Sequence, residues 1–374
     1  MIVVLLIIAI IYVPAIGWLI FGALRLPKFK VSNTKPITKF SIIIPFRNEE
    51  TNLEALLQSI DALAYPSQLF ELILVNDASE DKGELIIHRY LEKSQLQITM
   101  LQNNRISGSP KKDAIRKAME VVQHEWIIST DADCELPKNW LLCYDQLIRK
   151  EAPNMICGPV TYKRNKSFLN HFQFLDGLSL QGVALGSFGW KQPLLCNGAN
   201  LAYKRSIFEA VEAFQSNDHI ASGDDIFLLE KIQSNYPNTA YYLNCKEAVV
   251  LTKAEESWSQ VIQQRIRWAS KTSKQKNAHS KLLGAVVFLG NLAFLASFAL
   301  IAWSSSPIYF IWMTICFKIA VDLTLLKVAG HLLGRSFSFF QFLANIIIYP
   351  LLTIWVVINS FGGNYQWKGR NFKK

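Results

Sequence analysis

Residues 126–134 read WIISTDADC, a run of apolar and β-branched residues followed directly by Asp131 and Asp133. Three similar apolar runs precede it, FSIIIP at 40–45, FELILVND at 70–77 and LQITML at 96–101. Helical periodicity follows each of the four runs, over residues 48–63, 80–93, 110–123 and 137–150. Strands that alternate with helices predict βαβ units and a mostly parallel sheet. The runs are continuously apolar, which predicts a sheet covered on both faces. The expected fold class is α/β.

Polar residues cluster where these predicted strands end. They are Arg47, Asn48 and Glu49 after the first run, Asn76 and Asp77 after the second, and Asp131 and Asp133 after the fourth. In open α/β sheets ligands bind outside the carboxyl ends of the strands. Three acidic sites from separate loops are therefore expected to converge on one site.

The loop after residues 40–45 contains neither G-x-G-x-x-G nor G-x-x-x-x-G-K-[ST], so backbone amides are not expected to hold phosphates in the dinucleotide manner. Asp131 and Asp133 offer hard carboxylate oxygens, which suit Mg²⁺ or Mn²⁺ and could bridge the cation to a diphosphate. A plain Asx-type turn explains the same spacing equally well.

The composition indicates a membrane protein. The 374 residues carry a net charge of +10, and 51% of them are hydrophobic. Residues 1–24 form an uncharged stretch long enough to span a bilayer, and the positive residues follow it in the linker 25–39. The positive-inside rule then predicts an N-terminus outside and a cytoplasmic domain at 40–280. A basic recognition helix and metal-binding cysteine spacing are both missing from the sequence, so nucleic acid is not an expected partner.

Three further apolar stretches follow, at 282–303, 307–329 and 337–361. The first two predict a helical hairpin that turns at 304–307. Pro350 interrupts the third, which either crosses the membrane or re-enters, returning the basic tail 362–374 to the cytoplasm. Lys318 and Asp322 are spaced to meet on one helix face, either as a functional pair or as a self-neutralising one. The six cysteines are expected to be reduced thiols without a function.

Several segments together resemble glycosyltransferase family 2, inverting enzymes with the GT-A fold that include cellulose and hyaluronan synthases and ceramide glucosyltransferase. The resemblance covers roughly residues 38–275. Its segments are SIIIPFRNEE (41–50), VNDASED (75–81), STDADC (129–134), LLCNGANLAYKRSIF (194–208), SGDDIFLL (222–229) and QQRIRW (263–268).

The resemblance implies a role for each matched residue. Glu49 and Asp77 would lie near the nucleoside, Lys111 and Lys112 near the nucleotide, and Asp133 would bind the metal with Asp131 in support. Asn197, Gly198 and Asn200 would line the sugar and acceptor pocket. Asp225 falls where the catalytic base is found, beside Asp224. Gln264, Arg267 and Trp268 match Q-x-x-R-W, with Arg267 expected on the diphosphate and Trp268 on the acceptor sugar.

The sequence departs from the family pattern at two of these places. Pro110 replaces the usual glycine before the lysines, and Asp224 replaces a glutamate. WKGR at 367–370 also resembles C-terminal motifs of these enzymes, so Arg370 and Trp367 would reach the nucleotide site if the tail is cytoplasmic. An interfacial anchor explains WKGR equally well.

The expected function is metal-assisted transfer of a sugar from a nucleotide donor, with a uridine diphosphate sugar favoured, to a lipid or a growing surface glycan. A polyprenyl-phosphate sugar synthase and a degenerate, non-catalytic membrane protein are the alternatives. A degenerate protein should have lost Asp133, Asp225 or the Arg267–Trp268 pair, and all four residues are present.

Overall fold

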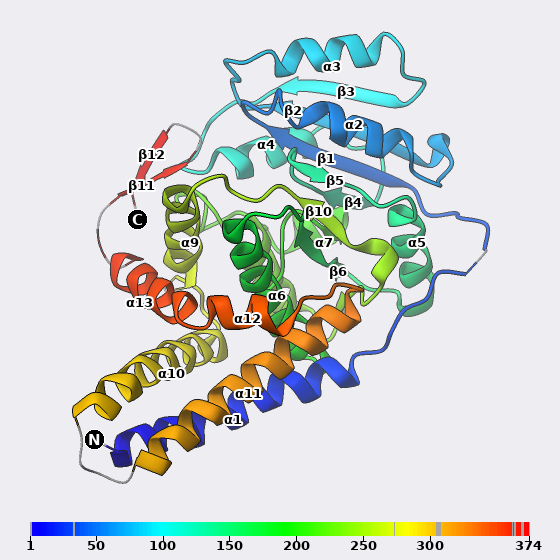
Figure 1. Ribbon diagram of the computed structural model, residues 1–374. Coiled ribbons are helices and arrows are strands. Elements are labelled where there is room, and N and C mark those ends of the chain that lie inside the picture. The colour runs from blue at the N-terminus through cyan, green and yellow to red at the C-terminus, as the bar shows by residue number, and fades with distance from the viewer. Residues whose placement is uncertain are drawn as a thin grey trace.

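The computed structural model describes residues 2–32, 34–272, 274–303, 308–360, 362, 364–367 and 370–373. A seven-stranded sheet lies at its centre, in the order β3-β2-β1-β4-β8-β6-β9 (Figure 1). The strands are β1 (Phe40–Phe46), β2 (Phe70–Asn76), β3 (Gln97–Gln102), β4 (Trp126–Ser129), β6 (Met155–Cys157), β8 (Leu201–Lys204) and β9 (Ala240–Tyr242). The described residues therefore confirm the predicted α/β fold class, with a mostly parallel sheet and attached apolar helices.

The first four strands form the predicted parallel repeats. β1 pairs in parallel with β2 and with β4, so that Ile43 lies opposite both Ile73 and Ser129. A helix follows each strand, in the order α2 (Leu53–Asp61), α3 (Gly83–Leu91), α4 (Pro110–Met119) and α5 (Trp140–Glu151). The carboxyl ends of β1, β2 and β4 thus meet at one edge of the sheet.

β8 runs antiparallel between β4 and β6, which turns the sheet from parallel to mixed. A small second sheet joins β5 (Cys134–Glu135), β10 (Val250–Thr252) and β7 (Val160–Tyr162). β5 begins at Cys134, so the Asp131–Asp133 loop is held between a strand of each sheet.

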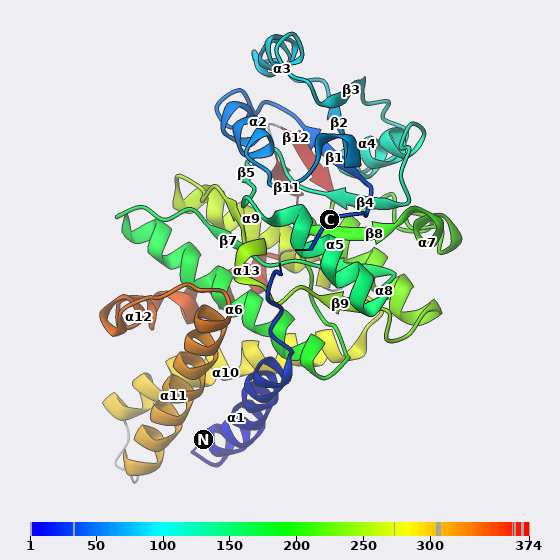
Figure 2. The ribbon, with the colours of Figure 1, turned by 90° about the vertical axis from the view of Figure 1, so that its right-hand side faces the viewer.

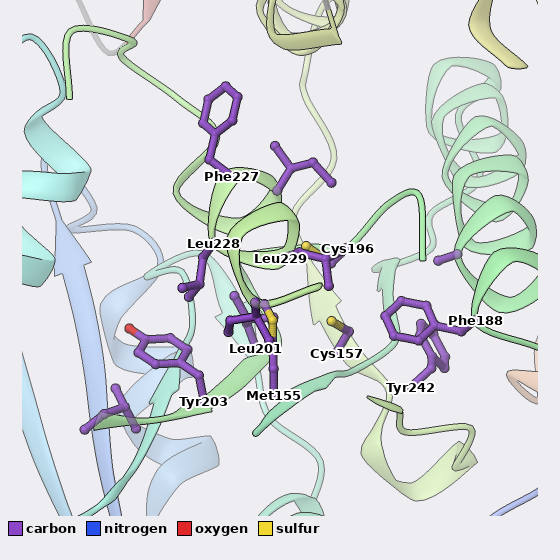
Figure 3. Packing of buried hydrophobic residues seen from close by; sticks show 14 of the residues in the cluster. Met155, Cys157, Phe188, Cys196, Leu201, Tyr203, Phe227, Leu228, Leu229 and Tyr242 are labelled. Atoms are coloured by element: carbon purple, nitrogen blue, oxygen red, sulfur yellow. The ribbon is translucent and has the colours of Figure 1, made fainter. Parts of the chain in front are cut away.

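Apolar side chains alternate between the two faces of the central sheet, as expected for strands. Ile42 and Ile44 face a core shared with α2 and α5, whereas Ile43 faces a core shared with α4, α6 (Phe168–Gly189) and α8 (Asp224–Asn235). Figure 3 shows part of the second core, where Leu201 and Tyr203 of β8 lie close to Leu228 of α8. Fully burying such a side chain stabilises the fold by roughly 1.5–3 kcal/mol.

Three helices are long and apolar enough to cross a membrane, namely α1 (Ile2–Arg25), α10 (Ala278–Trp303) and α11 (Ile308–Leu332). They coincide with three of the four predicted segments, and the predicted turn at 304–307 lies outside the described residues. Both views place α1 and α11 at the end of the molecule away from β3 (Figures 1 and 2). Asp322 accepts hydrogen bonds from Tyr12 on α1 and from Lys318, both at 2.6 Å, so the predicted charge pair also ties α11 to α1.

α6 joins the long apolar helices to the sheet domain. α1 and α11 both pack against α6. A Cβ placed on Gly22 of α1 would lie 2.1 Å from the carbonyl oxygen of Gly186, so the backbones of the two helices touch. Only a residue without a side chain permits this approach.

The fourth apolar segment does not form one straight helix. It is divided into α12 (Phe339–Asn345) and α13 (Ile348–Ser360), which are bent by 41°. The break precedes Pro350, which lies in the first turn of α13, where a missing N–H costs no hydrogen bond. Figure 1 shows both helices between the sheet domain and the far ends of α10 and α11.

The chain ends in a hairpin of β11 (Asn364–Trp367) and β12 (Arg370–Lys373). β11 lies against α9 (Trp258–Thr272), the helix that carries Q-x-x-R-W. The C-terminal hairpin is therefore on the same side of the membrane helices as the sheet domain (Figure 1).

Candidate active site

A cavity of about 660 Å³ opens where β1, β2 and β4 end. Its volume is typical of a small-molecule site. Most of the predicted site residues line it: Glu49, Asp77, Lys111, Asp131, Asp133, Asn197, Gly198, Asp224, Asp225, Gln264, Arg267 and Trp268. The convergence that the strand pattern predicts is thus present, and the segments from 194 to 268 contribute to the same cavity.

Asp77, at the end of β2, is surrounded by cationic side chains. Its carboxylate accepts hydrogen bonds at 2.8 Å from Arg105 and Asn103, and Arg370 lies 2.5 Å from its other oxygen. Arg47 donates to the carbonyl oxygen of Asp77 at 3.0 Å. These contacts fix the carboxylate at the cavity wall, and they bring the C-terminal hairpin to the predicted nucleoside position. The side chain of Trp367 lies outside the described part of the chain.

Lys111 connects the metal motif to the predicted base region. Its ammonium group lies 2.7 Å from Asp131 and 3.1 Å from Asp224. Burial by itself lowers the pKa of Lys111, but the two carboxylates outweigh burial and the pKa lies above its ordinary value. The lysine therefore stays charged and holds two acidic loops together.

Asp133 lines the cavity beside Asp131, whose side chain is 40% exposed. Burial, followed by the negative charge of Asp131, raises the pKa of Asp133 to about 6. A cation nearby would stabilise the charged form of a carboxylate in such surroundings.

Lys112 does not take the predicted place beside the nucleotide. It is buried beneath α4, where its ammonium group donates to the carbonyl oxygens of Asn217 at 2.5 Å and Ile220 at 3.1 Å. Successive helical residues point about 100° apart. Lys111 therefore faces the cavity, and Lys112 instead holds the loop before α8.

Asp224 and Asp225 begin α8, after Gly223 in the left-handed conformation (φ 86°). Asp225 accepts a hydrogen bond from the backbone N–H of Gly198 at 3.1 Å, and Lys271 lies 3.8 Å away. Burial would raise the pKa of Asp224, but Lys111 and Lys271 outweigh it and the pKa is lowered. Lysines thus offset the repulsion between the neighbouring carboxylates.

The segment around residues 194–200 contributes to the cavity only in part. Asn197 and Gly198 line it, whereas Asn200 is fully buried behind it. The side-chain oxygen of Asn200 accepts hydrogen bonds from Trp140 at 2.8 Å and Tyr144 at 2.7 Å. Its side-chain nitrogen donates to two backbone carbonyl oxygens. Asn200 therefore supports the wall, and the expectation that it lines the pocket is wrong.

Gln264, Arg267 and Trp268 line the cavity from α9, and Gln264 donates to Glu255 at 2.7 Å. Arg265, to which sequence reasoning gave no role, also lines this wall. It pairs with Asp176 of α6, and its guanidinium lies 4.3 Å from the centre of the Trp268 ring. The sequence feature that could have indicated this pair is Asp176 within the apolar stretch of α6, because a buried charge needs a partner of opposite charge.

The carboxylates of Asp131 and Asp133 suit the predicted divalent cation, and Asp131 is also paired with Lys111. Among the described residues no group of three or more His, Cys, Asp and Glu side chains could hold a metal ion. Mg²⁺ usually takes one or two carboxylates and completes its shell with substrate phosphates and water. The donor set here suits a cation that arrives with a nucleotide.

Comparison with known proteins agrees with this geometry. Residues 41–211, from β1 to the end of α7 (Arg205–Ala210), match the family described as "Glycosyl transferase family 2". The chain is 26% identical over 250 residues to the probable glycosyltransferase YdaM of Bacillus subtilis, a match that covers 66% of this chain and 57% of YdaM. It is 36% identical over 102 residues to the undecaprenyl-phosphate 4-deoxy-4-formamido-L-arabinose transferase of Photorhabdus laumondii. This match covers 27% of this chain and 31% of that transferase.

Both matches span less than two thirds of the relative's own length. Among solved structures, the mannosyltransferase PcManGT from Pyrobaculum calidifontis, in complex with GDP-Man and Mn²⁺, is similar with a TM-score of 0.58. That similarity covers 89% of this chain and 98% of the other at 17% identity, so it is one of fold. The chain therefore has the predicted GT-A-type fold, and its residues 41–211 are similar to glycosyl transferase family 2 domains.

Proposed function

We propose that the protein is a membrane-bound, inverting hexosyltransferase that moves a sugar from a nucleotide donor to a lipid or glycan acceptor. The observation that carries this proposal is the single cavity shared by the Asp131–Asp133 loop, Lys111 and Asp225. A uridine diphosphate sugar is the proposed donor.

The donor would lie along the carboxyl edge of the sheet. Glu49 and Asp77 would contact the nucleoside, and Lys111 would offset the charge of the diphosphate. Asp133 would hold Mn²⁺ or Mg²⁺, which when bound neutralises negative charge on the departing diphosphate. Arg267 would add a bidentate contact to the same phosphates.

Asp225 is the proposed base. An acceptor oxygen attacks the anomeric carbon as the bond from that carbon to the diphosphate oxygen breaks. The acceptor proton passes to Asp225, and the anomeric configuration is inverted. The hydrogen bond from the N–H of Gly198 orients the carboxylate, and Lys271 stabilises its charged form. Trp268 and Asn197 would position the acceptor.

The proposed topology places the N-terminus outside and the sheet domain in the cytoplasm, beside the basic linker 25–39. The contact of Arg370 with Asp77 supports a tail on the same side of the membrane as the sheet domain. The 41° bend between α12 and α13 is consistent with a segment that re-enters rather than crosses.

The experiment incubates purified protein in detergent with Mn²⁺, a panel of nucleotide sugars and membrane-lipid extract, and measures release of nucleoside diphosphate. Release from one donor, abolished by a chelator and restored by Mn²⁺, is expected. Folded protein that releases no diphosphate from any donor would contradict the proposal.

A further inference from the structure

The cavity that holds Asp225 continues between the apolar helices. Beyond the sheet domain its wall is formed by α1, α10, α11, α12 and α13. The side chains of this extension, called here the apolar arm, are mainly aliphatic. They include Leu283, Val287, Ile319, Leu326, Leu352 and Val356.

The apolar arm extends partway along the membrane helices. On α10 its lining residues run from Leu283 to Phe294, roughly 16 Å along the axis at ~1.5 Å per residue. The hydrocarbon core of a bilayer is about 30 Å thick, so the arm reaches about half its depth.

The inner end of the arm is marked by a polar cluster. Lys318 and Tyr12 both contact Asp322, and all three side chains line the cavity. Among the described residues, those before Tyr12 on α1 and those after Phe294 on α10 contribute nothing to the wall. The arm is therefore open to Asp225 at one end and does not extend along the full length of these helices.

We propose that the apolar arm binds the hydrocarbon chain of a membrane-lipid acceptor whose reacting oxygen lies at Asp225. The inference rests on the proposed function and narrows its acceptor to an amphiphile. Inside the arm the chain keeps surroundings as apolar as the bilayer, so the lipid can present its head group without exposing its chain to water.

A growing glycan fits the arm poorly. Each sugar carries several hydroxyl groups, and a hydroxyl buried without a hydrogen-bond partner is costly. The wall is mainly aliphatic and offers few such partners, chiefly Asn345, Tyr349 and Thr353, and a polymer would also need an exit beyond Phe294 and Lys318. The shape of the apolar arm therefore suits the addition of a single sugar to a lipid.

Gly284 allows the arm to be blocked without disturbing the sheet domain. It lies on α10 in the cavity wall, and a Cβ placed there meets nothing within 4 Å. Gly17 on α1 has the same open surroundings but does not line the cavity. Gly284→Phe is therefore the test variant, and Gly17→Phe is its matched control.

The first measurement uses full-length protein in phosphatidylcholine vesicles and a long-chain alcohol with a diazirine at its tail. The readout is saturable photolabelling of Phe294 and Leu325 near the inner end of the arm, which are only 4% and 5% exposed and so are shielded from bulk lipid. Labelling is expected in wild type and Gly17→Phe, and at least tenfold less in Gly284→Phe. No saturable labelling in wild type, or equal labelling in Gly284→Phe, would overturn the inference whether or not the protein is active.

The second measurement compares transfer to diacylglycerol, polyprenyl phosphate and water-soluble glycerol or phosphate monoesters. Transfer to either lipid, at least tenfold faster than to the soluble compounds and reduced in Gly284→Phe, supports the inference and identifies the head group. Equal transfer to soluble acceptors contradicts it while leaving the proposed glycosyltransferase intact. If the arm is photolabelled but the protein cleaves no nucleotide sugar, the result would instead contradict the proposed function.

Discussion

The guanidinium of Arg370 lies 2.5 Å from the carboxylate of Asp77, although 293 positions separate the two residues. The contact joins the C-terminal hairpin to the residue that follows β2, and both residues line the cavity. Arg370 thereby adds a positive charge to the wall that the proposed nucleotide diphosphate would face.

Arg370→Ala is expected to raise the KM for the nucleotide sugar about tenfold, the equivalent of about 1.4 kcal/mol. The physical reason is the loss of a charged contact beside an anionic donor. Steady-state kinetics at fixed acceptor concentration checks the prediction, with Arg370→Lys as the charge-conserving control. An unchanged KM would show that the hairpin does not contribute to donor binding.

Lys111→Met is expected to weaken binding of a nucleotide sugar at least tenfold in the presence of Mn²⁺. Without the ammonium group, Asp131 and Asp224 lose their shared cation, and the donor loses a positive charge. Isothermal titration calorimetry measures the dissociation constant. A variant that binds the donor as tightly as wild type does would refute the assigned role of Lys111.

The adjacent substitution, Lys112→Met, should behave differently. It removes the ammonium group that donates hydrogen bonds to the carbonyl oxygens of Asn217 and Ile220. The free energy of unfolding should fall by about 1–3 kcal/mol. Donor affinity of the folded protein is expected to stay within twofold of wild type. Thermal unfolding and calorimetry on one sample separate the two effects, and a stable variant with lost affinity would reverse the assignments.

Asp176→Asn should destabilise the protein by about 3–5 kcal/mol, because it leaves Arg265 buried without its anionic partner. Glu209→Gln breaks an exposed pair with Arg205 and should cost less than about 1 kcal/mol. Denaturant unfolding of the two variants in parallel checks the contrast. Equal, small losses would mean that Arg265 is not held by Asp176.

The sequence predicts the parts of the site that follow from local pattern. Strand runs and helical periodicity identify the βα repeats, and parallel strands bring Glu49, Asp77, Asp131 and Asp133 to one edge. This convergence at the carboxyl edge follows from the parallel strands alone and needs no knowledge of side-chain packing.

Long-range packing explains what the sequence did not predict. Lys111 and Lys112 are indistinguishable as neighbours in sequence, yet the turn of α4 places only Lys111 in the cavity. The partners of Asn200, Trp140 and Tyr144, are 60 and 56 positions away. Such distant contacts become visible only when the sheet and α5 are packed together.

The most direct test of the account compares wild type with Asp225→Asn, measuring donor affinity and transfer rate on the same preparations. If Asp225 is the base, Asp225→Asn should bind the nucleotide sugar with unchanged affinity but transfer the sugar at least a hundredfold more slowly, because general-base catalysis contributes about 10²–10⁴-fold. Transfer at the wild-type rate in Asp225→Asn would contradict the assignment of Asp225 as the base.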